Sequence, residues 1–530
     1  MNIDRICNAA ELENLINSTP DGGVCVLPKK EYYIERQVVI KNKKDITVDG
    51  NGALVISKYD NAKDYTASVD AFLIDGCNNV TFGNLVMDTS VPANVTATVM
   101  EINRDEKWVV LKVDNSFEMY GNEVLMSFNT MDSEGSPDYH MNYYSKHPDP
   151  NIVTLILGEI LLANTYASAK YDYLGNNTFK VYFGSINDTL CVGERMCIRH
   201  TMYGNSAITL KDSNDTVINN VTMHHVPGMA IIVLPRCKNL TVDGLKVVSG
   251  GKWDSLMPGN CDGIHLTGLY GDFVMKNCVF DGMGDDALNV HATAGTITEL
   301  IDENNIRCGY CKKGPDGTLP VRWCEEGDII KAYNPDTMVN TAVLKAKSFV
   351  DGILNFEVIE GGYALGDTLQ NMTYAPSCEI EGCVIRNTRA RGLIIQTSNV
   401  EIKNCTFFGM SSCAVKVAPD FKYWYEVGPT YNFNMHHNVI EKCAFRSEYD
   451  PSIGIFTKHA TGIDDIFHVH KNIKIENNLI KRANRSCITV TASDGVVVSG
   501  NVFENRAYND VDCINVVNCT DVTVENNIEK

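Results

Sequence analysis

Acidic side chains recur at a chemically suggestive interval in the stretch NCDGIHLTGLYGDFVMKNCVFDGMGDDALNVH, which runs from Asn260 to His291. Asp262 comes first, and the adjacent Asp285 and Asp286 begin 285 − 262 = 23 residues later. If 23 residues make one turn of a repeating structure, the three carboxyl groups project from one face, with backbones about 5 Å apart. Carboxyl groups this close repel one another, so at least one keeps its proton to a higher pH than a free Asp. Such a set can protonate a leaving oxygen and activate a water molecule, which is the acid/base chemistry of glycosidic bond cleavage.

Two other interpretations of these acids are weighed against catalysis. An Asp beside Gly at a chain corner often does no more than shape a turn, and for a single Asp that is the commoner case. A Ca²⁺ cluster also uses carboxylates and carbonyls. The twin acids one interval after another acid, among neighbouring Asn and His side chains, favour a catalytic site over both. The neighbours that we expect on the same patch are Asn260, His265, Asn289 and His291.

The same interval recurs along the chain, which indicates a repeat. Segments such as KNCVF, EGCVI and KNCTF share a β-branched alternation that ends in Asn or Gly and continues with a small or polar corner residue. Corner residues recur at 405 − 383 = 22 (Cys383, Cys405) and at 501 − 478 = 23 (Asn478, Asn501). A unit this short cannot bury an apolar face alone, but stacked units can. The sequence therefore predicts an all-β protein, a right-handed parallel β-helix with two or three strands in each coil.

Two stretches lack the corner motif although they are rich in strand-forming residues, and both end in a similar Gly-Glu or Gly-Asp turn shortly before the repeat resumes. We interpret them as two small antiparallel β-barrels inserted into the β-helix. The predicted segments are N-terminal coils over 1–95, a first barrel over 96–200, coils with the acidic residues over 201–292, a second barrel over 293–375, and C-terminal coils over 376–530.

Composition narrows the classes of partner. The chain has 530 residues and a formal net charge of −20, which argues against nucleic acid and favours a neutral substrate. No stretch reaches the roughly 18 apolar residues of a membrane span, and the N-terminus shows no secretory leader. The 19 cysteines include no convincing metal-type spacing. We therefore predict no metal, no cofactor and no membrane partner. Reduced thiols and the missing leader predict a cytoplasmic protein, or a secreted or periplasmic one if a leader was trimmed.

Four motifs resemble those of glycoside hydrolase family 110, the α-1,3-galactosidases that act on blood-group-B-type and linear galactosides. They are NCDGIH, GDDALNVH, RARGLIIQT (Arg389 to Thr397) and YWYEVG (Tyr423 to Gly428). The family's β-helix, interrupted by two small barrels, is similar to the insertion pattern described above. The resemblance implies an exo-acting, inverting hydrolase that releases terminal non-reducing α-1,3-linked galactose, and it makes a homodimer an expectation. It also implies that Asp285 is the general acid, while Asp262 and Asp286 hold the attacking water.

Seven further residues are predicted to bind the sugar. An aromatic ring can stack on galactose, a carboxylate can accept its hydroxyls, and the two arginines can donate to the sugar or neutralise the acids. These residues are His265, Asn289, His291, Arg389, Arg391, Trp424 and Glu426.

Two alternative functions stay open on the sequence. A polygalacturonase-like inverting hydrolase would share the acidic pattern. However, such enzymes carry Gly-His-Gly and Arg-Ile-Lys tripeptides that this chain lacks, and its pI near 5.0 suits an acidic glycan poorly. A non-catalytic carbohydrate-binding β-helix would need no carboxylates on adjacent coils.

Overall fold

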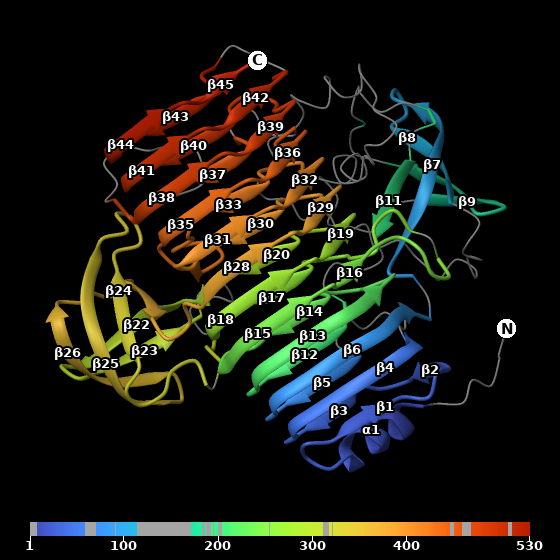
Figure 1. Cartoon of the computed structure of the whole chain (residues 1–530), viewed down its shortest axis with the longest axis horizontal. Helices are drawn as coiled ribbons and strands as arrows, with labels where there is room; N and C mark the ends of the chain where they lie inside the picture. The colour runs from blue at the N-terminus through green and yellow to red at the C-terminus, as the bar shows by residue number, and fades with distance from the viewer. Residues whose placement is uncertain are drawn as a thin grey trace.

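The structure is a computed structural model, and it describes the chain in sections separated by gaps. The described residues are 8–58, 70–90, 92–113, 171–182, 186, 192–193, 195–199, 204–253, 255–310, 317–320, 322–445, 450–457, 468–506 and 511–530. In these sections the chain forms one short helix and a series of strands that stack into a solenoid, with a barrel on one side (Figure 1). The all-β, β-helical fold predicted from the repeat is therefore confirmed.

Parallel strands from successive coils form two long sheets that run the length of the solenoid. The 11-stranded sheet contains β3 (Val38–Lys41), β5 (Phe72–Asp75), β12 (Ile208–Lys211), β14 (Ile231–Val233), β17 (Ile264–Leu266), β20 (Leu288–Val290), β30 (Leu393–Ile395), β33 (Val415–Val417), β37 (Ile453–Ile455), β40 (Ile488–Thr491) and β43 (Ile514–Val517). We call it the site sheet, because the acidic residues lie beside it.

The 21-stranded sheet bends through a corner and so forms the other two faces of the solenoid. It contains β1 (Val24–Val26), β2 (Glu31–Ile34), β4 (Lys44–Ser57), β6 (Asn78–Thr89), β13 (Asn214–Met223), β15 (Cys237–Asp243), β16 (Lys246–Val247), β18 (Leu269–Lys276), β19 (Val279–Asp281), β28 (Ser377–Glu381), β29 (Val384–Arg386), β31 (Val400–Lys403), β32 (Thr406–Phe408), β35 (Tyr431–His436), β36 (Val439–Glu441), β38 (His470–Glu476), β39 (Leu479–Lys481), β41 (Ser493–Ser499), β42 (Val502–Glu504), β44 (Thr520–Glu525) and β45 (Ile528–Glu529).

The corner between these two faces explains the repeated motif. The first motif residue has a positive φ, as at Asn404 (φ 56°) and Asn477 (φ 53°), a conformation that Asn and Gly adopt readily. The next residue is buried, and the register of the following strands stacks Cys383 on Cys405 and Asn478 on Asn501. The corner alignment read from the sequence is therefore correct in these coils.

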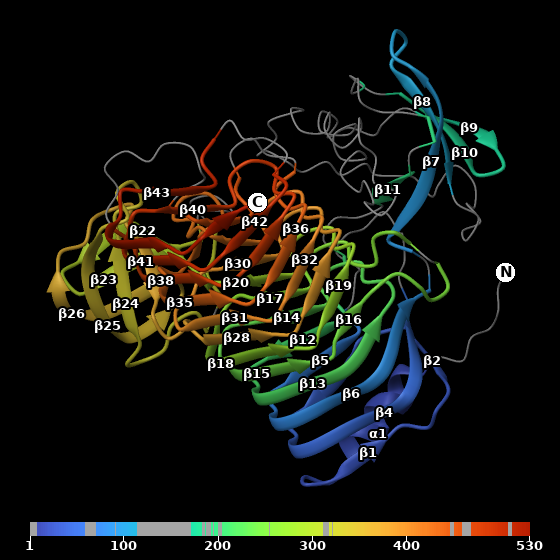
Figure 2. The same cartoon turned by 45° about the horizontal axis from the view of Figure 1, so that its top comes forward.

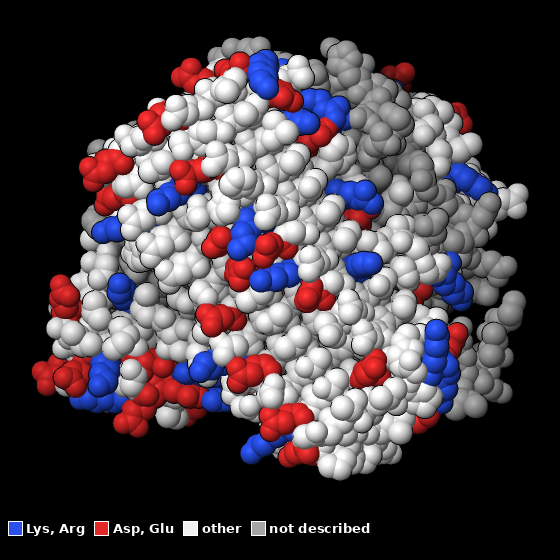
Figure 3. Space-filling model, in the orientation of Figure 1, with Lys and Arg blue, Asp and Glu red and all other residues white. Residues whose placement is uncertain are grey.

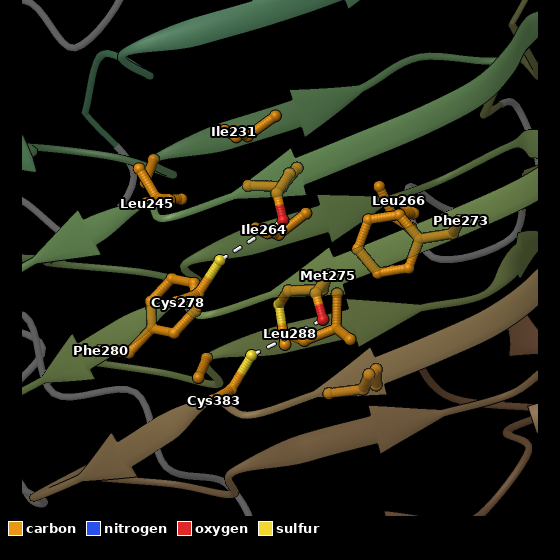
Figure 4. Close-up of a cluster of buried hydrophobic side chains, with 14 of the residues drawn as sticks. Ile231, Leu245, Ile264, Leu266, Phe273, Met275, Cys278, Phe280, Leu288 and Cys383 are labelled. Carbon is orange, nitrogen blue, oxygen red and sulfur yellow. Dashed lines mark hydrogen bonds between the residues drawn. The ribbon is translucent and has the colours of Figure 1, made fainter. Parts of the chain in front are cut away.

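The interior of the solenoid is a single apolar core. Figure 4 shows part of it, where Ile264 and Leu288 of the site sheet face Phe273, Met275 and other side chains of the opposite sheet. The thiols of the corner cysteines lie inside this core and donate weakly to backbone carbonyls of the preceding coil. Cys278 Sγ lies 3.6 Å from the Val242 oxygen, for example. These cysteines pack as small apolar residues, as the sequence predicts.

The N-terminal end of the solenoid is covered by α1 (Ala9–Ser18), which lies against the first coil (Figure 2). Its buried side chains are Ala9, Leu12 and Ile16, spaced three and four residues apart on one face of the helix. The helix covers core residues that a further coil would otherwise have to bury, which is the role of a cap in a repeat protein.

The second insertion is a closed antiparallel barrel with its own apolar core. Its strands, in the order in which they neighbour one another, are β22 (Gly295–Asp302), β23 (Asn305–Gly309), β26 (Ile353–Gly361), β25 (Asn340–Val350), β24 (Ile329–Tyr333) and β27 (Thr368–Asn371). The solenoid continues across the barrel without a break, because β20 pairs in parallel with β30. The barrel projects from the lower left of the solenoid in Figure 1.

The first insertion forms a five-stranded antiparallel sheet among its described residues. The strand order is β11 (Arg195–Arg199), β7 (Asn94–Asn103), β8 (Trp108–Val113), β10 (Thr178–Tyr182) and β9 (Tyr171–Gly175). Residues 114–170, in the middle of the predicted first barrel, lie outside the described residues. The solenoid again continues across the insertion, through the parallel pairing of β6 with β13.

On the face shown in Figure 3, lysine and arginine side chains lie among aspartate and glutamate, and no broad basic surface is visible. Among the described residues, no helix is long and apolar enough to cross a membrane.

Candidate active site

The predicted site residues meet at one edge of the site sheet, on coils that the parallel register stacks directly. Ile264 pairs with Leu288, and Leu288 pairs with Leu393. Asp262 and Asp286 each lie two residues before these positions, so they occupy the same place on adjacent coils, and Arg391 occupies that place on the next coil. The true step between equivalent acids is therefore 24 residues, from Asp262 to Asp286.

The residue that follows each polar side chain in this column is small for a packing reason. A Cβ added at Gly263 would lie 2.4 Å from the Phe280 ring and 2.5 Å from the Ala287 oxygen. The corresponding residue after Asp286 is Ala287, and Gly392 follows Arg391. The core therefore requires small residues here, and this packing fixes the backbone that carries the acids.

The three aspartates form one compact cluster. Taking one carboxylate oxygen from each of Asp262, Asp285 and Asp286, all three atoms lie within 4.8 Å of one another. The backbone N–H of Asp286 donates to Asp262 Oδ1 at 3.0 Å, which ties the two coils together. The side chain of Asp285 is the most exposed of the three at 21%, compared with 7% for Asp262 and 2% for Asp286.

Two arginines on the next coil neutralise part of this charge. Arg391 grips Asp286 with its side chain and its backbone: Nη2 lies 2.9 Å from Oδ2, and both Nε and the backbone nitrogen lie 2.9 Å from Oδ1. Arg389 Nη2 lies 3.1 Å from Asp285 Oδ1, and Arg389 Nε donates to the Gly284 oxygen. Both arginines lie in the turn before β30, beside the acids of the preceding coil. The acids are thus their direct partners.

Burial and mutual repulsion raise the proton affinity of the cluster. For Asp262, burial first, and then the charges of Asp285 and Glu426, raise the pKa well above that of an ordinary carboxyl group. For Asp286, burial raises the pKa well above its ordinary value, with Arg391 opposing the rise and Asp285 adding to it. Asp262 and Asp286 therefore keep a proton to a higher pH than an ordinary aspartate does.

A second group of predicted residues lies beside the aspartates. His265 Nδ1 lies 2.5 Å from Asp262 Oδ2, and its Nε2 lies 3.0 Å from Nε2 of His291 on the next coil. Asn289 pairs in register with His265 and donates from Nδ2 to Glu426 Oε2 at 3.2 Å. His291 Nε2 is also 3.8 Å from Glu426 Oε1. Four predicted sugar-binding residues therefore form one network that begins at Asp262.

Glu426 reaches this network from a distant part of the sequence. It begins β34 (Glu426–Val427), which pairs antiparallel with β21 (Ala292–Thr293) directly after His291. Trp424, two residues earlier, packs edge-on against Tyr423 at a ring-centroid distance of 5.1 Å and is partly exposed. This pairing brings the aromatic segment beside the acid-bearing coils.

The predicted neighbour Asn260 has a different role from the other polar residues. It is fully buried, and its Oδ1 accepts a hydrogen bond of 2.7 Å from Asn94 Nδ2 of the first insertion. Asn94 also donates to the Met257 oxygen at 2.8 Å. Asn260 thus anchors the insertion to the coil that leads into Asp262.

Sequence reasoning missed Lys416, which lies on the same outward face as His265 and Asn289. The register runs from His265 through Asn289 and Ile394 to Lys416. Its neighbours Val415 and Val417 point into the core, so Lys416 points outward, yet it is only 7% exposed. The signal was present in the sequence as a lysine within the apolar run CAVKVA.

Two groups of these side chains have the composition and spacing of cation ligands. One is the aspartate cluster, and the other is His265, His291 and Glu426. Arg389 and Arg391 already supply positive charge to two of the three aspartates, so the first group has less need of a cation.

Fold and site together define a parallel β-helix protein that carries a cluster of three carboxyl groups on one face. A family model described as a right-handed β-helix region matches residues 364–528.

Comparison with related sequences assigns the chain more specifically. The chain is 23% identical over 484 residues to α-1,3-galactosidase B of Bacteroides thetaiotaomicron, covering 88% of this chain and 74% of that protein. It is 24% identical over 512 residues to α-1,3-galactosidase A of Bacteroides fragilis, covering 92% and 81%. The resemblance to the α-1,3-galactosidase family that the motifs indicate is confirmed by these homologues, which support a glycoside hydrolase function for the chain.

Proposed function

We propose that the chain is an exo-acting, inverting α-galactosidase that releases terminal non-reducing α-1,3-linked galactose from oligosaccharides or glycoconjugates of the linear or blood-group-B type. One observation carries the proposal. Three carboxyl groups meet within 4.8 Å beside the site sheet, in a chain whose relatives are named α-1,3-galactosidases over about nine tenths of its length.

The proposed reaction assigns a different role to each acid. Asp285 is the most exposed carboxyl group, and it donates its proton to the glycosidic oxygen as the bond to galactose C1 breaks. Asp262 and Asp286 hold a water molecule between them. The water oxygen forms the new bond to C1, and one of these two carboxylates takes its proton. Arg391 keeps Asp286 fixed, because all three of its contacts with that carboxylate are 2.9 Å long.

The short distance between the carboxyl groups also fits a second stereochemical outcome, retention of configuration at galactose C1. Inverting enzymes usually separate their two carboxyl groups by about 6.5–9.5 Å to admit a water, and retaining enzymes by about 5–5.5 Å. The separation here, at most 4.8 Å between oxygens, lies nearer to the retaining range. What supports inversion is that every oxygen of Asp262 and Asp286 has a protein contact, an arrangement suited to holding water rather than attacking a sugar.

The network beside the acids supports recognition of a single galactose unit. Imidazole, amide and carboxylate groups of His265, Asn289 and Glu426 offer both donors and acceptors for ring hydroxyls. The partly exposed ring of Trp424 is available to stack on the apolar face of the sugar.

A substrate panel tests the proposal. Galactose release is measured from an α-1,3-galactosyl disaccharide and from 4-nitrophenyl α-galactoside, and the release of reducing ends is measured from polygalacturonate, with the Asp285→Asn variant as the blank. The expected result is galactose from the α-1,3 disaccharide and no product from polygalacturonate. Cleavage of polygalacturonate would instead support the polygalacturonase-like alternative. A folded protein that binds the disaccharide without cleaving it would support the non-catalytic alternative.

A further inference from the structure

Three side chains from separate parts of the sequence converge beside the aspartate cluster. His265 lies on β17, His291 follows β20, and Glu426 begins β34. One ligand atom from each lies within 4.8 Å of the other two, and the two Nε2 atoms face each other at 3.0 Å. Convergence of two imidazole nitrogens and a carboxylate oxygen on one point is the arrangement of a three-ligand metal site.

The outer atoms of two of these side chains, His265 and Glu426, are held as they are in metal sites. Metal-binding histidines almost always donate their other ring N–H to a carboxylate or carbonyl, and ligating carboxylates are in turn hydrogen-bonded. Here His265 Nδ1 lies 2.5 Å from Asp262 Oδ2, which favours a proton on Nδ1 and a lone pair on Nε2. Asn289 Nδ2 donates to Glu426 Oε2 at 3.2 Å, which leaves Glu426 Oε1 facing His291.

The donor set selects a class of metal. Imidazole nitrogen combined with carboxylate oxygen suits Zn²⁺ and related first-row divalent ions better than Ca²⁺ or Mg²⁺, which prefer oxygen alone. Three protein ligands also leave a coordination position open, as in sites that bind water or substrate.

We propose that His265, His291 and Glu426 bind one divalent transition-metal ion of the Zn²⁺ class. Its open position faces the acid-bearing side of the site sheet and accepts a water or a sugar hydroxyl. The sequence predicts no metal, because the three ligands do not lie in one short motif and only the coil register and the β21–β34 pairing bring them together. The metal site shares His265 and Glu426 with the proposed sugar contacts, so with the ion bound a sugar hydroxyl would meet its open position in place of these two side chains.

Metal binding is tested directly on the full chain. Protein dialysed against a chelator is titrated with Zn²⁺ by calorimetry and with Co²⁺ by visible absorption, which reports the ligand geometry. We expect about one equivalent bound per chain. The variants His265→Ala and His291→Ala should each lose that equivalent, and Asn289→Ala should weaken binding about 10–100-fold.

A matched control comes from a second histidine pair. The Nδ1 atoms of His436 and His437 lie 2.8 Å apart, and Glu401 Oε1 lies 3.4 Å from His436 Nε2. The two contacts use different nitrogens of the His436 ring, so the three groups do not surround one point. His436→Ala should leave Zn²⁺ binding unchanged.

Two results would overturn the proposal: no Zn²⁺ or Co²⁺ binding by the folded wild type, or binding that survives in both His265→Ala and His291→Ala. Circular dichroism checks that each variant folds. Glu426→Gln provides the decisive variant if a histidine replacement unfolds the coils, because Glu426 lies on the two-stranded β21–β34 pair outside them. Galactose release is measured in parallel. This measurement distinguishes a protein that binds metal without activity from a protein that is active without binding metal.

Discussion

Two stacks of polar side chains run along this solenoid. They have the same coil spacing, but one stack is held by hydrogen bonds and the other brings like charges together. At the corner of the large sheet, Asn438, Asn478, Asn501 and Asn527 lie on successive coils. From Asn478 onward, each Oδ1 accepts from the backbone N–H and from Nδ2 of the asparagine before it, as Asn501 does from Asn478 at 3.0 and 3.1 Å. Beside the site sheet, the stacked residues are aspartates, whose ionised carboxylates can only accept. Stacked amides form hydrogen bonds with one another. Stacked carboxylates repel one another, and this repulsion is reduced by the neighbouring arginines and by protons that the carboxyl groups keep.

This comparison separates structural from functional polar residues in a repeat protein. Three of the four asparagines are buried, and each amide oxygen in the stack accepts hydrogen bonds, so the contribution of the stack is stability. Repulsion and burial of the stacked aspartates lower the free energy of unfolding. Destabilising groups of this kind are typical of functional sites.

The largest effect is expected from breaking the aspartate stack. Asp285→Asn removes the proposed acid while keeping its shape, and turnover should fall about 10²–10⁴-fold because general-acid catalysis is lost. Initial rates of galactose release measure the loss, and thermal melting checks the fold. A variant with near-normal turnover would remove Asp285 from the role of acid.

Breaking the asparagine stack should act on stability alone. Asn478→Ala deletes an amide that accepts from Asn438 and donates to Asn501 and to the Met435 oxygen. Leaving these buried partners unpaired should lower the free energy of unfolding by about 3 kcal/mol, with turnover per folded molecule unchanged. Urea denaturation measures the change, with the exposed Thr523→Ala as control. Equal denaturation midpoints for the two variants would mean that the stack contributes nothing.

A buried histidine at the start of β38 extends the contrast between neutral and charged groups. Burial lowers the pKa of His470 to about 4, although the hydrogen bond from the ring to the Phe456 oxygen opposes this shift. The other ring nitrogen accepts a hydrogen bond from the Thr430 N–H. The unfolded chain therefore binds the extra proton first, so this contribution to stability is complete above about pH 6.5 and is lost as the pH falls towards 4. Between pH 7 and pH 5, wild type should lose about 2 kcal/mol more than His470→Gln does. Parallel losses in the two proteins would contradict the lowered pKa.

The smallest predicted effect concerns Lys416, the buried cation on the face of the site sheet. Its ammonium group is available to a sugar hydroxyl, and a charged hydrogen bond of about 1.5 kcal/mol corresponds to about a tenfold change in kcat/KM. Lys416→Met should therefore lower kcat/KM by about that factor, whereas the exposed Lys471→Met should not. Steady-state kinetics on the α-1,3 disaccharide decides between a contact with substrate and a purely structural residue.

The sequence predicted those features that the repeat itself encodes. The corner residues define the coil, and the coil places Asp262 beside Asp285 and Asp286. The sequence did not show which of Asp285 and Asp286 is equivalent to Asp262, because a step of 23 or 24 residues fits the motif equally well.

What the sequence could not supply are contacts between coils and connections far away in the chain. Glu426 joins His291 only through the pairing of β34 with β21, and Asn94 joins Asn260 only because the first insertion folds back. Arg389 and Arg391 contact Asp285 and Asp286 although the second insertion separates them from these acids in the sequence. No periodicity within either segment records these contacts.

Proton NMR of the galactose anomer formed first from an α-1,3-galactosyl disaccharide tests the central claim most directly, that the stacked carboxyl groups activate a water molecule. Attack by water on the face opposite the leaving group yields β-galactose first, and this is the result we predict. The appearance of α-galactose first would show retention, and it would mean that one of these carboxylates attacks the sugar itself.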